Sequence, residues 1–327
     1  MNSAQTADPI NDMNIYFHGE DFRPEPWLSA LRQALAEVGI VAEVAVWEPG
    51  APPADYALVW APPQRLLDEQ TRLKALFNLG AGVDAITKLR FPPGMRLVRL
   101  DDAGMSAQMA EYVLHALVRH FREFDAYEAE AAQGHWGFRR PRLRQDWPVG
   151  ILGLGVLGQR VARAVLGLDF PVRGWSRAPR RAEDLGLPGL QCYAGRDELP
   201  AFLAASKVLV CLLPLTAETQ GILNRDTLAQ LMPGGYLINV ARGGHLVEED
   251  LIPLIDSGHL AGATLDVFRQ EPLPAGHPFW THPKITVTPH TAARTLREES
   301  VAQIAGKIAR LERGEPIAGL VDLDRGY

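Results

Sequence analysis

The sequence predicts an α/β protein built around two parallel sheets. Short apolar segments alternate with amphipathic stretches in two separate series, which is the pattern of strands joined by helical crossovers. The length of 327 residues suggests about two domains at roughly 150 residues each. Hydrophobic residues make up 47% of the chain and charged residues 22%, so it has enough apolar material for two cores.

The first series runs from about Met13 to about Val98. Its short apolar segments predict strands, because they are bounded by turn residues. An amphipathic stretch after the first of them predicts a helix that ends at Gly39. The expected strands cover residues 14–19, 41–48, 56–63, 73–82 and 95–100, and the expected helix covers 26–39.

A long stretch without glycine or proline separates the two series. Residues Ser106–Glu130 keep a helical apolar period for more than six turns, which predicts one long helix at the junction of two domains. The next segment contains Gly, Pro and a cluster of arginines, which end the helix.

The second series again alternates strands and helices. The expected strands are 147–155, 172–176, 207–214, 234–241, 262–268 and 284–290, and the expected helices are 156–168, 225–231 and 247–260. A long amphipathic helix is expected over the tail, from Ala293 to Arg313.

Composition excludes several classes of protein. A net charge of −6 is not the electrostatic footprint of a general nucleic-acid binder. Cys192 and Cys211 cannot form a disulfide framework and have no metal-ligand spacing, so we expect a reducing compartment, the cytoplasm, and no metal. The polar first 14 residues do not resemble a secretory signal. No apolar run approaches the roughly 18 residues of a membrane span.

A glycine-rich turn follows the first strand of the second series. Gly153, Gly155 and Gly158 form G-x-G-x-x-G between an expected strand and an expected helix. In this context the first glycine permits a tight turn, the second lets the backbone approach a pyrophosphate, and the third allows close helix packing. We therefore expect a dinucleotide site, and the alternative is a strand–helix turn without a ligand.

The end of the next strand indicates which dinucleotide binds. An NAD site usually has Asp or Glu there to bind the ribose hydroxyls. This chain instead has Ser176 and Arg177, followed by Arg180 and Arg181. Because a carboxylate would repel a 2′-phosphate and these groups would hold it, we expect NADPH to be preferred over NADH. The alternative is a solvated basic turn.

Three polar residues follow successive strands of the second series: Arg242, Glu271 and His290. Ligands bind beyond the carboxyl ends of parallel strands, so all three are placed to face one crevice. Arginine offers a fork for a carboxylate, histidine exchanges a proton near neutral pH, and a carboxylate orients the imidazole and favours its charged form. This set suits the reduction of a 2-keto acid.

Taken together, the motifs resemble those of the D-isomer-specific 2-hydroxyacid dehydrogenase family. GLGVLG, NVARGG, LDVFRQEPL and TPH occur in the family's order, and FNLGAGVD (Phe77–Asp84) and AQMAEYVL (Ala107–Leu114) match its earlier landmarks. The resemblance covers nearly the whole chain. DYALVWAPP, GWSR and LDVFRQEPLP resemble one branch in particular, the glyoxylate/hydroxypyruvate reductases of type A.

The resemblance implies two Rossmann-like domains with a cleft between them that holds the active site. A flavodoxin-like substrate domain would comprise residues 1–105 and 295–327, and a dinucleotide-binding domain residues 106–294. The family usually forms homodimers through the cofactor domain, and the helix near Ala107–Glu130 matches its interdomain and dimer helix.

It also implies roles for individual residues. Arg242 would bind the substrate carboxylate and carbonyl, His290 would be the acid/base and Glu271 its partner. Ala81 and Gly82 match a loop whose amides hold the substrate carboxylate, and Trp47 matches a tryptophan near the substrate mouth. Asp266 matches a contact to the nicotinamide carboxamide, although a strand-end cap is the alternative from the residues alone. The expected cofactor residues are Gly153, Gly155, Val156, Leu157, Gly158, Ser176, Arg177, Arg180, Leu213, Pro214, Ala241, Asp266 and His290.

The expected activity is NADPH-dependent reduction of glyoxylate to glycolate and of hydroxypyruvate to D-glycerate. One alternative keeps the chemistry with another 2-keto acid; a phosphorylated substrate would call for cations adjacent to Ala81–Asp84, and none is there. Another alternative is a nucleotide-sensing corepressor, since such proteins also resemble the family. The expected partner is thus a small 2-keto or 2-hydroxy acid, without nucleic acid or membrane.

Overall fold

The chain divides into two compact units in the computed structural model, which describes residues 13–323 and 325. One unit combines the chain up to Gly104 with the chain from Thr295 onward, and the other is Met105–Arg294. Most of the polar N-terminal segment, in which we expect no secretory signal, lies outside the described residues.

The first unit is built on a five-stranded parallel sheet of order β2-β1-β3-β4-β5. Its strands are β1 (Met13–His18), β2 (Ala42–Val46), β3 (Tyr56–Val59), β4 (Ala75–Asn78) and β5 (Arg96–Arg99). This is the flavodoxin-like order, in which the order of the strands reverses between β1 and β3.

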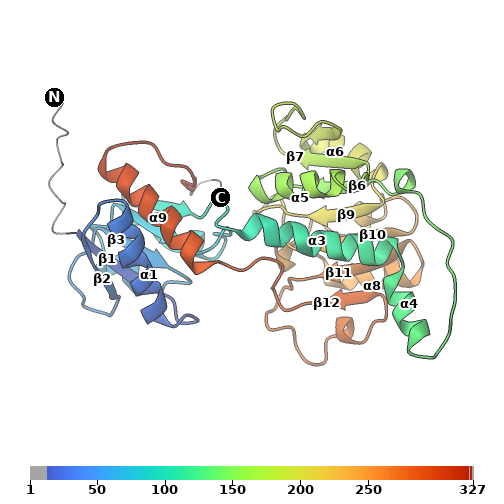
Figure 1. Cartoon of the computed structure of the whole chain (residues 1–327), viewed down its shortest axis with the longest axis horizontal. Coiled ribbons are helices and arrows are strands. Elements are labelled where there is room, and N and C mark those ends of the chain that lie inside the picture. The colour runs from blue at the N-terminus through green and yellow to red at the C-terminus, as the bar shows by residue number, and fades with distance from the viewer. Residues whose placement is uncertain (1–12, 324, 326–327) are drawn as a thin grey trace. The chain divides into compact units, whose positions relative to one another are not determined.

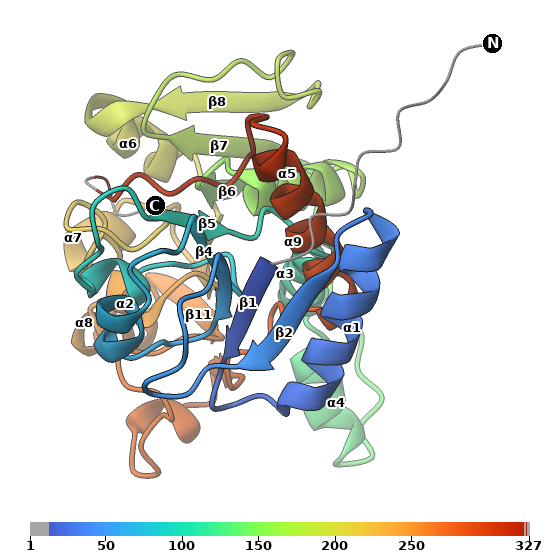
Figure 2. The ribbon, with the colours of Figure 1, turned by 90° about the vertical axis from the view of Figure 1, so that its left-hand side faces the viewer.

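Both faces of this sheet are covered by helices. Successive strand residues point to opposite sides of a sheet, and all residues of β3 and β4 are buried, so both faces need a covering layer. Phe17 stacks on Trp27 of α1 (Pro24–Glu37), with ring centroids 5.8 Å apart, whereas Tyr16 belongs to a buried cluster with Leu66 of α2 (Gln64–Glu69). Helix α9 (Arg297–Glu312) packs beside α1 (Figures 1 and 2). The C-terminal helix thereby completes a unit that begins near the N-terminus.

The second unit is built on a seven-stranded parallel sheet of order β12-β11-β10-β9-β6-β7-β8. Its strands are β6 (Val149–Leu152), β7 (Val172–Ser176), β8 (Leu190–Ala194), β9 (Val208–Cys211), β10 (Gly235–Asn239), β11 (Leu260–Leu265) and β12 (Ile285–Val287). The order reverses between β6 and β9, as in dinucleotide-binding folds. The predicted fold class is therefore confirmed for both sheets.

Helices also cover both faces of the second sheet (Figure 1). On one face α3 (Met105–Phe121) packs against α5 (Val156–Leu166), and Val113 and Val161 share one core with the strands. On the other face, Phe202 and Leu251 share a second core. The helices of that face are α6 (Gly195–Ala204), α7 (Arg225–Leu228) and α8 (Glu248–Asp256).

The prediction of one helix over 106–130 is wrong. The structure has α3 and then α4 (Phe124–Ala131), separated by Glu123 in a left-handed conformation with φ of 56°. Arg139 and Arg142 lie 3.3 and 3.0 Å from the Glu123 carboxylate, so side chains distant in sequence hold the turn.

Other element predictions also need correction. The tail helix begins at Arg297 rather than Ala293, and α2, β8 and α6 were not predicted. Among the described residues, no helix has the length and apolarity that crossing a bilayer requires.

Candidate active site

The carboxyl edge of the second sheet gathers most of the predicted site residues. The glycine turn follows β6, Leu213 and Pro214 follow β9, Ala241 and Arg242 follow β10, Asp266 and Glu271 follow β11, and His290 follows β12. Because all these strands are parallel, the residues share one edge. In such sheets the ligand crevice opens where the strand order reverses, which here is between β6 and β9.

His290 and Glu271 form an ion pair at this edge. His290 Nδ1 lies 2.8 Å from Glu271 Oε2, and Glu271 Oε1 accepts the Phe268 N–H at 2.9 Å. The side chains are 45% and 36% exposed, so both remain accessible. Since Nδ1 is engaged by the carboxylate, Nε2 is the ring nitrogen left to meet a substrate.

The charge of Glu271 is stabilised by its surroundings. Burial raises the pKa of Glu271, but hydrogen bonds from His290 and the Phe268 N–H, together with the charges of His290 and Arg242, outweigh it and lower that pKa. The carboxylate is therefore ionised at neutral pH.

The backbone at His290 is in the left-handed region, with φ of 52°. Its N–H is bonded to the Asp266 carbonyl at 2.9 Å. Such a conformation in a residue other than glycine costs roughly 1–3 kcal/mol, so the surrounding contacts must hold it.

Asp266 supplies those contacts. Its carboxylate, which is 1% exposed, accepts hydrogen bonds from Thr288 Oγ1 at 2.6 Å and from the N–H groups of Thr291 and Ala292 at 2.8 Å each. Tyr112 of α3 in turn lies 2.5 Å from Thr288 Oγ1. Three of about four acceptor positions of the carboxylate are thus occupied by the turn that carries His290. This matches the strand-end cap, and a nicotinamide contact stays a prediction.

Arg242 ends the segment after β10. Its Nη1 donates to the Ala241 carbonyl at 2.6 Å, and the Asn239 side-chain amide donates to the Arg242 carbonyl at 3.2 Å. The buried His245 ring lies 3.0 Å from the Arg242 carbonyl and 3.2 Å from that of Pro214. The imidazole therefore ties the arginine segment to the loop after β9.

The glycine turn has the shape that a dinucleotide pyrophosphate requires. Gly153 has φ of 105°, and a Cβ on Gly158 would lie 1.8 Å from the Gly153 carbonyl oxygen, so both positions require glycine. At Gly155, by contrast, no described atom lies within 4 Å of a Cβ, which leaves the backbone open to a ligand. Val156 and Leu157 begin α5, whose N–H groups and dipole favour a phosphate. The residues present fit the predicted cofactor.

The basic turn after β7 lies at the surface. Arg177 and Arg180 are exposed, whereas Ser176 is half-buried and its hydroxyl donates to the Ala178 carbonyl at 2.8 Å. Arg181 lies 3.8 Å from Glu183. Of the basic residues predicted to bind a 2′-phosphate, Arg177 and Arg180 are thus accessible to it.

The loop after β4 in the first unit contains Ala81 and Gly82. The buried Asn78 side chain donates hydrogen bonds to the carbonyls of Gly80 at 3.0 Å and Gly82 at 2.9 Å. Because C=O and N–H point in opposite directions across a trans peptide, the N–H groups of Ala81 and Val83 point away from Asn78. Asn78 thereby orients amides in this loop, as the predicted carboxylate site needs.

Trp47 follows β2 at the carboxyl edge of the first sheet and is 6% exposed. Its ring meets His18, at the end of β1, edge to face with centroids 5.7 Å apart. Within the described part of the chain, neither Trp47 Nε1 nor His18 Nε2 has a hydrogen-bond partner.

Comparison with known proteins identifies the family. Residues 114–292 match the model of the D-isomer specific 2-hydroxyacid dehydrogenase NAD binding domain. The chain belongs to this family. It is therefore an NAD(P)-dependent oxidoreductase.

Similar proteins extend over the full length of this dehydrogenase. Glyoxylate/hydroxypyruvate reductase A of Serratia proteamaculans (strain 568) is 48% identical over 96% of the chain and all of the relative. A D-isomer specific 2-hydroxyacid dehydrogenase of Xanthobacter autotrophicus Py2, solved with NADPH and MES, has a TM-score of 0.89 and 40% identity, covering 96% of this chain and 99% of that one.

A second solved structure is an NADPH-dependent glyoxylate/hydroxypyruvate reductase of Sinorhizobium meliloti, in complex with NADP and sulfate. Its TM-score is 0.86 at 36% identity, covering 97% of this chain and all of that one. The resemblance read from the motifs is thus confirmed, including its branch.

The sequence did not single out three residues that bind backbone groups: Asn78 in the first unit, and His245 and Glu248 in the second. Asn78 lies within the motif FNLGAGVD, and His245 and Glu248 follow NVARGG by a few residues. A polar residue in or just after a motif was the available signal.

Proposed function

We propose that this dehydrogenase uses NADPH to reduce glyoxylate to glycolate and hydroxypyruvate to D-glycerate. The observation that carries the proposal is the His290–Glu271 pair, with Nδ1 and Oε2 2.8 Å apart, at the sheet edge that also carries Arg242. The activities in the names of the Serratia and Sinorhizobium relatives support the choice of substrates.

The residues divide the chemistry as follows. Arg242 binds the substrate carboxylate through its fork and polarises the keto oxygen. NADPH, when bound, supplies a hydride for the carbonyl carbon. As negative charge grows on the oxygen, His290 donates a proton to it from Nε2 and becomes neutral. Glu271 keeps the ring oriented through its contact with Nδ1.

The glycine turn and the basic turn hold the cofactor in this proposal. Gly153, Gly155 and Gly158, with Val156 and Leu157, receive the pyrophosphate, while Ser176, Arg177 and Arg180 receive the 2′-phosphate. Leu213, Pro214 and Ala241 line the adenine and nicotinamide sites, and Asp266 contacts the carboxamide with its remaining acceptor position. The NADPH and NADP in the structures of two relatives support this preference.

The first unit contributes to substrate binding in this proposal. The backbone of Ala81 and Gly82, turned by Asn78, binds the carboxylate, and Trp47 limits the size of the substituent. A hydrogen or a hydroxymethyl group is then accepted more readily than a bulky one.

We also propose a cytoplasmic homodimer that associates through the second unit. Trp136 and Phe138 in that unit are 86% and 87% exposed, and exposed aromatic pairs of this kind mark association surfaces. Cys192 and Cys211 are free, as suits a reducing compartment. Light scattering should give the molar mass of a dimer for the protein. For Trp136→Ser it should give a lower average molar mass, because the dimer is weakened.

The test of the activity is NADPH oxidation with a panel of 2-keto acids, repeated with NADH. We expect the highest kcat/KM for glyoxylate and hydroxypyruvate with NADPH. A higher kcat/KM for phenylpyruvate would refute the substrate assignment, and equal efficiency with NADH would refute the cofactor preference.

A further inference from the structure

Glu248 is a buried carboxylate next to the His290–Glu271 pair that has no part in the chemistry described so far. It is the first residue of α8 and is 9% exposed. Burying an ionised carboxylate is costly unless it is paired and hydrogen-bonded. The contacts it makes therefore show what the position is built to hold.

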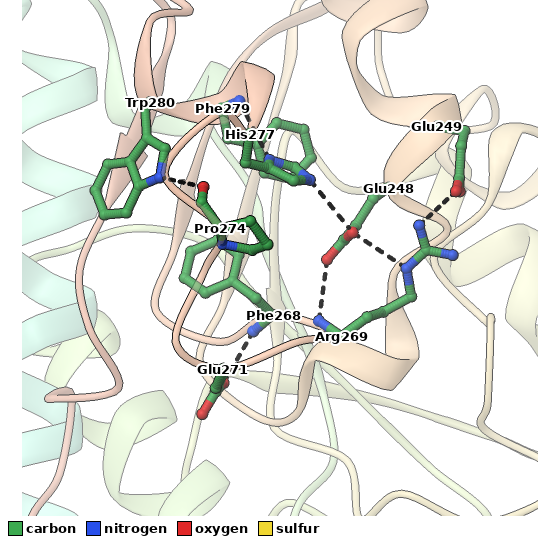
Figure 3. Close-up of polar contacts among 9 residues, drawn as sticks. All are labelled: Glu248, Glu249, Phe268, Arg269, Glu271, Pro274, His277, Phe279 and Trp280. Carbon is green, nitrogen blue, oxygen red and sulfur yellow. Dashed lines mark hydrogen bonds and ion pairs between the residues drawn. The ribbon is translucent and has the colours of Figure 1, made fainter.

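These contacts converge on Arg269 (Figure 3). Glu248 Oε1 accepts the backbone N–H of Arg269 at 3.0 Å, and Oε2 accepts Arg269 Nε at 3.1 Å. His277 faces the same carboxylate, with Nε2 3.6 Å from Oε2, while its Nδ1 accepts the Phe279 N–H at 3.3 Å.

The main chain at Phe268 and Arg269 is consequently held from three sides. Glu271 Oε1 accepts the Phe268 N–H at 2.9 Å, and Glu248 accepts the Arg269 N–H. At Gly243, a Cβ would lie 1.8 Å from the Phe268 carbonyl carbon, so the segment that follows Arg242 packs directly on the Phe268–Arg269 peptide. Two consecutive peptides, which carry the Phe268 and Arg269 N–H groups, therefore link the arginine segment, helix α8 and the Glu271 carboxylate.

We propose that Glu248 is a positioning residue for the proton-transfer pair. By holding the Arg269 N–H it fixes the Phe268–Arg269 peptide, and with it the preceding peptide, whose Phe268 N–H orients Glu271 toward His290. The role in catalysis rests on the proposed function, while the positioning of the pair is a property of this unit alone.

Neighbouring Glu249 provides a matched control. It also pairs with the Arg269 guanidinium, but it is 66% exposed and its bond with Arg269 runs through the side chain (Figure 3). Glu249→Gln removes a charge from the same helix turn and the same arginine, and it leaves the peptide hold intact. Glu248→Gln retains an oxygen for the Arg269 N–H, whereas Glu248→Ala loses it.

The first readout is the NMR signal of the His290 imidazole, identified by its loss in His290→Ala. It needs no substrate. Glu271→Gln should shift the signal of Nδ1, because it replaces the carboxylate that lies 2.8 Å from this nitrogen. Glu248→Ala should reproduce most of this change, and Glu248→Gln and Glu249→Gln should stay near wild type. If Glu248→Ala does not fold, Glu248→Asp, one methylene too short, carries the same expectation.

The second readout is turnover with glyoxylate. Glu248→Ala should lower kcat by about 10-fold, part of the 10²–10⁴ that a general acid contributes, with KM for NADPH unchanged. An unmoved His290 Nδ1 signal in Glu248→Ala overturns the inference, even if kcat falls through instability. If the wild-type protein shows no turnover but Glu248→Ala still moves this signal, the proposed function is rejected and the positioning role is supported.

Discussion

Alanine at Gly155 and alanine at Gly158 should have opposite consequences, although the two glycines belong to one turn. A Cβ at Gly158 would lie 1.8 Å from the Gly153 carbonyl oxygen, where ordinary contact begins at 3.4 Å. The start of α5 would have to move by about 1.6 Å, the difference between these distances, because neither backbone atom can rotate away. At Gly155 the φ of −72° suits alanine and the Cβ meets no described atom within 4 Å.

The magnitudes follow from these distances. Overpacking of backbone on backbone at Gly158 should cost about 3 kcal/mol, and the better helix propensity of alanine returns about 1 kcal/mol. The net loss of about 2 kcal/mol corresponds to a fall in Tm of about 4–8 °C for a unit of this size. At Gly155, the less favourable N-cap should cost only about 0.5 kcal/mol.

The affinity for NADPH should depend on Gly155, although the stability does not. The methyl group of Gly155→Ala occupies the space that the pyrophosphate needs, so Kd for NADPH should rise by about 10-fold or more, equivalent to about 1.4 kcal/mol. The assay combines thermal unfolding of both variants without ligand and fluorescence titration with NADPH. An unchanged Tm in Gly158→Ala, or wild-type affinity in Gly155→Ala, would refute the reasoning.

Three further predictions concern single side chains. Arg242→Lys keeps the charge but loses the fork, so kcat/KM for glyoxylate should fall by about 10²-fold or more; near-normal efficiency would contradict its role. Arg177→Ala should raise Kd for NADPH by about 10-fold and leave that for NADH unchanged, as parallel titrations would show. Burial lowers the pKa of His120 to about 3, below its unfolded value, so stability should fall as the pH drops below about 6.5. The free energy of unfolding, measured with urea, should be about 2 kcal/mol lower at pH 5 than at pH 7. His120→Phe should not show this decrease.

Local signals in the sequence account for most of the fold. The strands were predicted because apolar residues and turn residues delimit them, and the glycine turn because Gly153 and Gly158 have no substitutes at such positions. The place of Arg242, Glu271 and His290 followed from the parallel order, since carboxyl ends of parallel strands share one edge. These inferences need only the spacing of apolar residues, the positions of the glycines and the handedness of βαβ units.

The elements that were missed depend on distant contacts or conflicting local signals. Helix α6 begins at Gly195 and contains Pro200, two residues that disfavour helix, so its sequence does not predict a helix. The break at Glu123 has no glycine or proline, and it is held by Arg139 and Arg142, which follow in a later segment. A single-sequence pattern carries no information about such a pairing.

The geometry of the site was likewise beyond sequence patterns, because its supporting residues bind the main chain. Asp266 left two interpretations open, and the cap is the one whose hydrogen bonds the structure contains. The left-handed backbone of His290 is imposed by that cap and by the Glu271 pair, neither of which a local propensity describes.

Asn78, Asp266 and Glu248 share one physical arrangement. Each is nearly buried, at 3%, 1% and 9% exposure, and each bonds to at least one backbone group of a loop at a strand end. A buried polar group with several partners is costly to displace, because every lost bond leaves an unsatisfied group. Loops that would otherwise be mobile are thereby held with the accuracy that proton transfer demands, since misplacement by about 1 Å can reduce a rate by about 10²-fold. His290 and Glu271 can accordingly be half-exposed and still keep their geometry, because the buried Asp266 holds the turn that carries His290 and the Phe268 N–H holds Glu271.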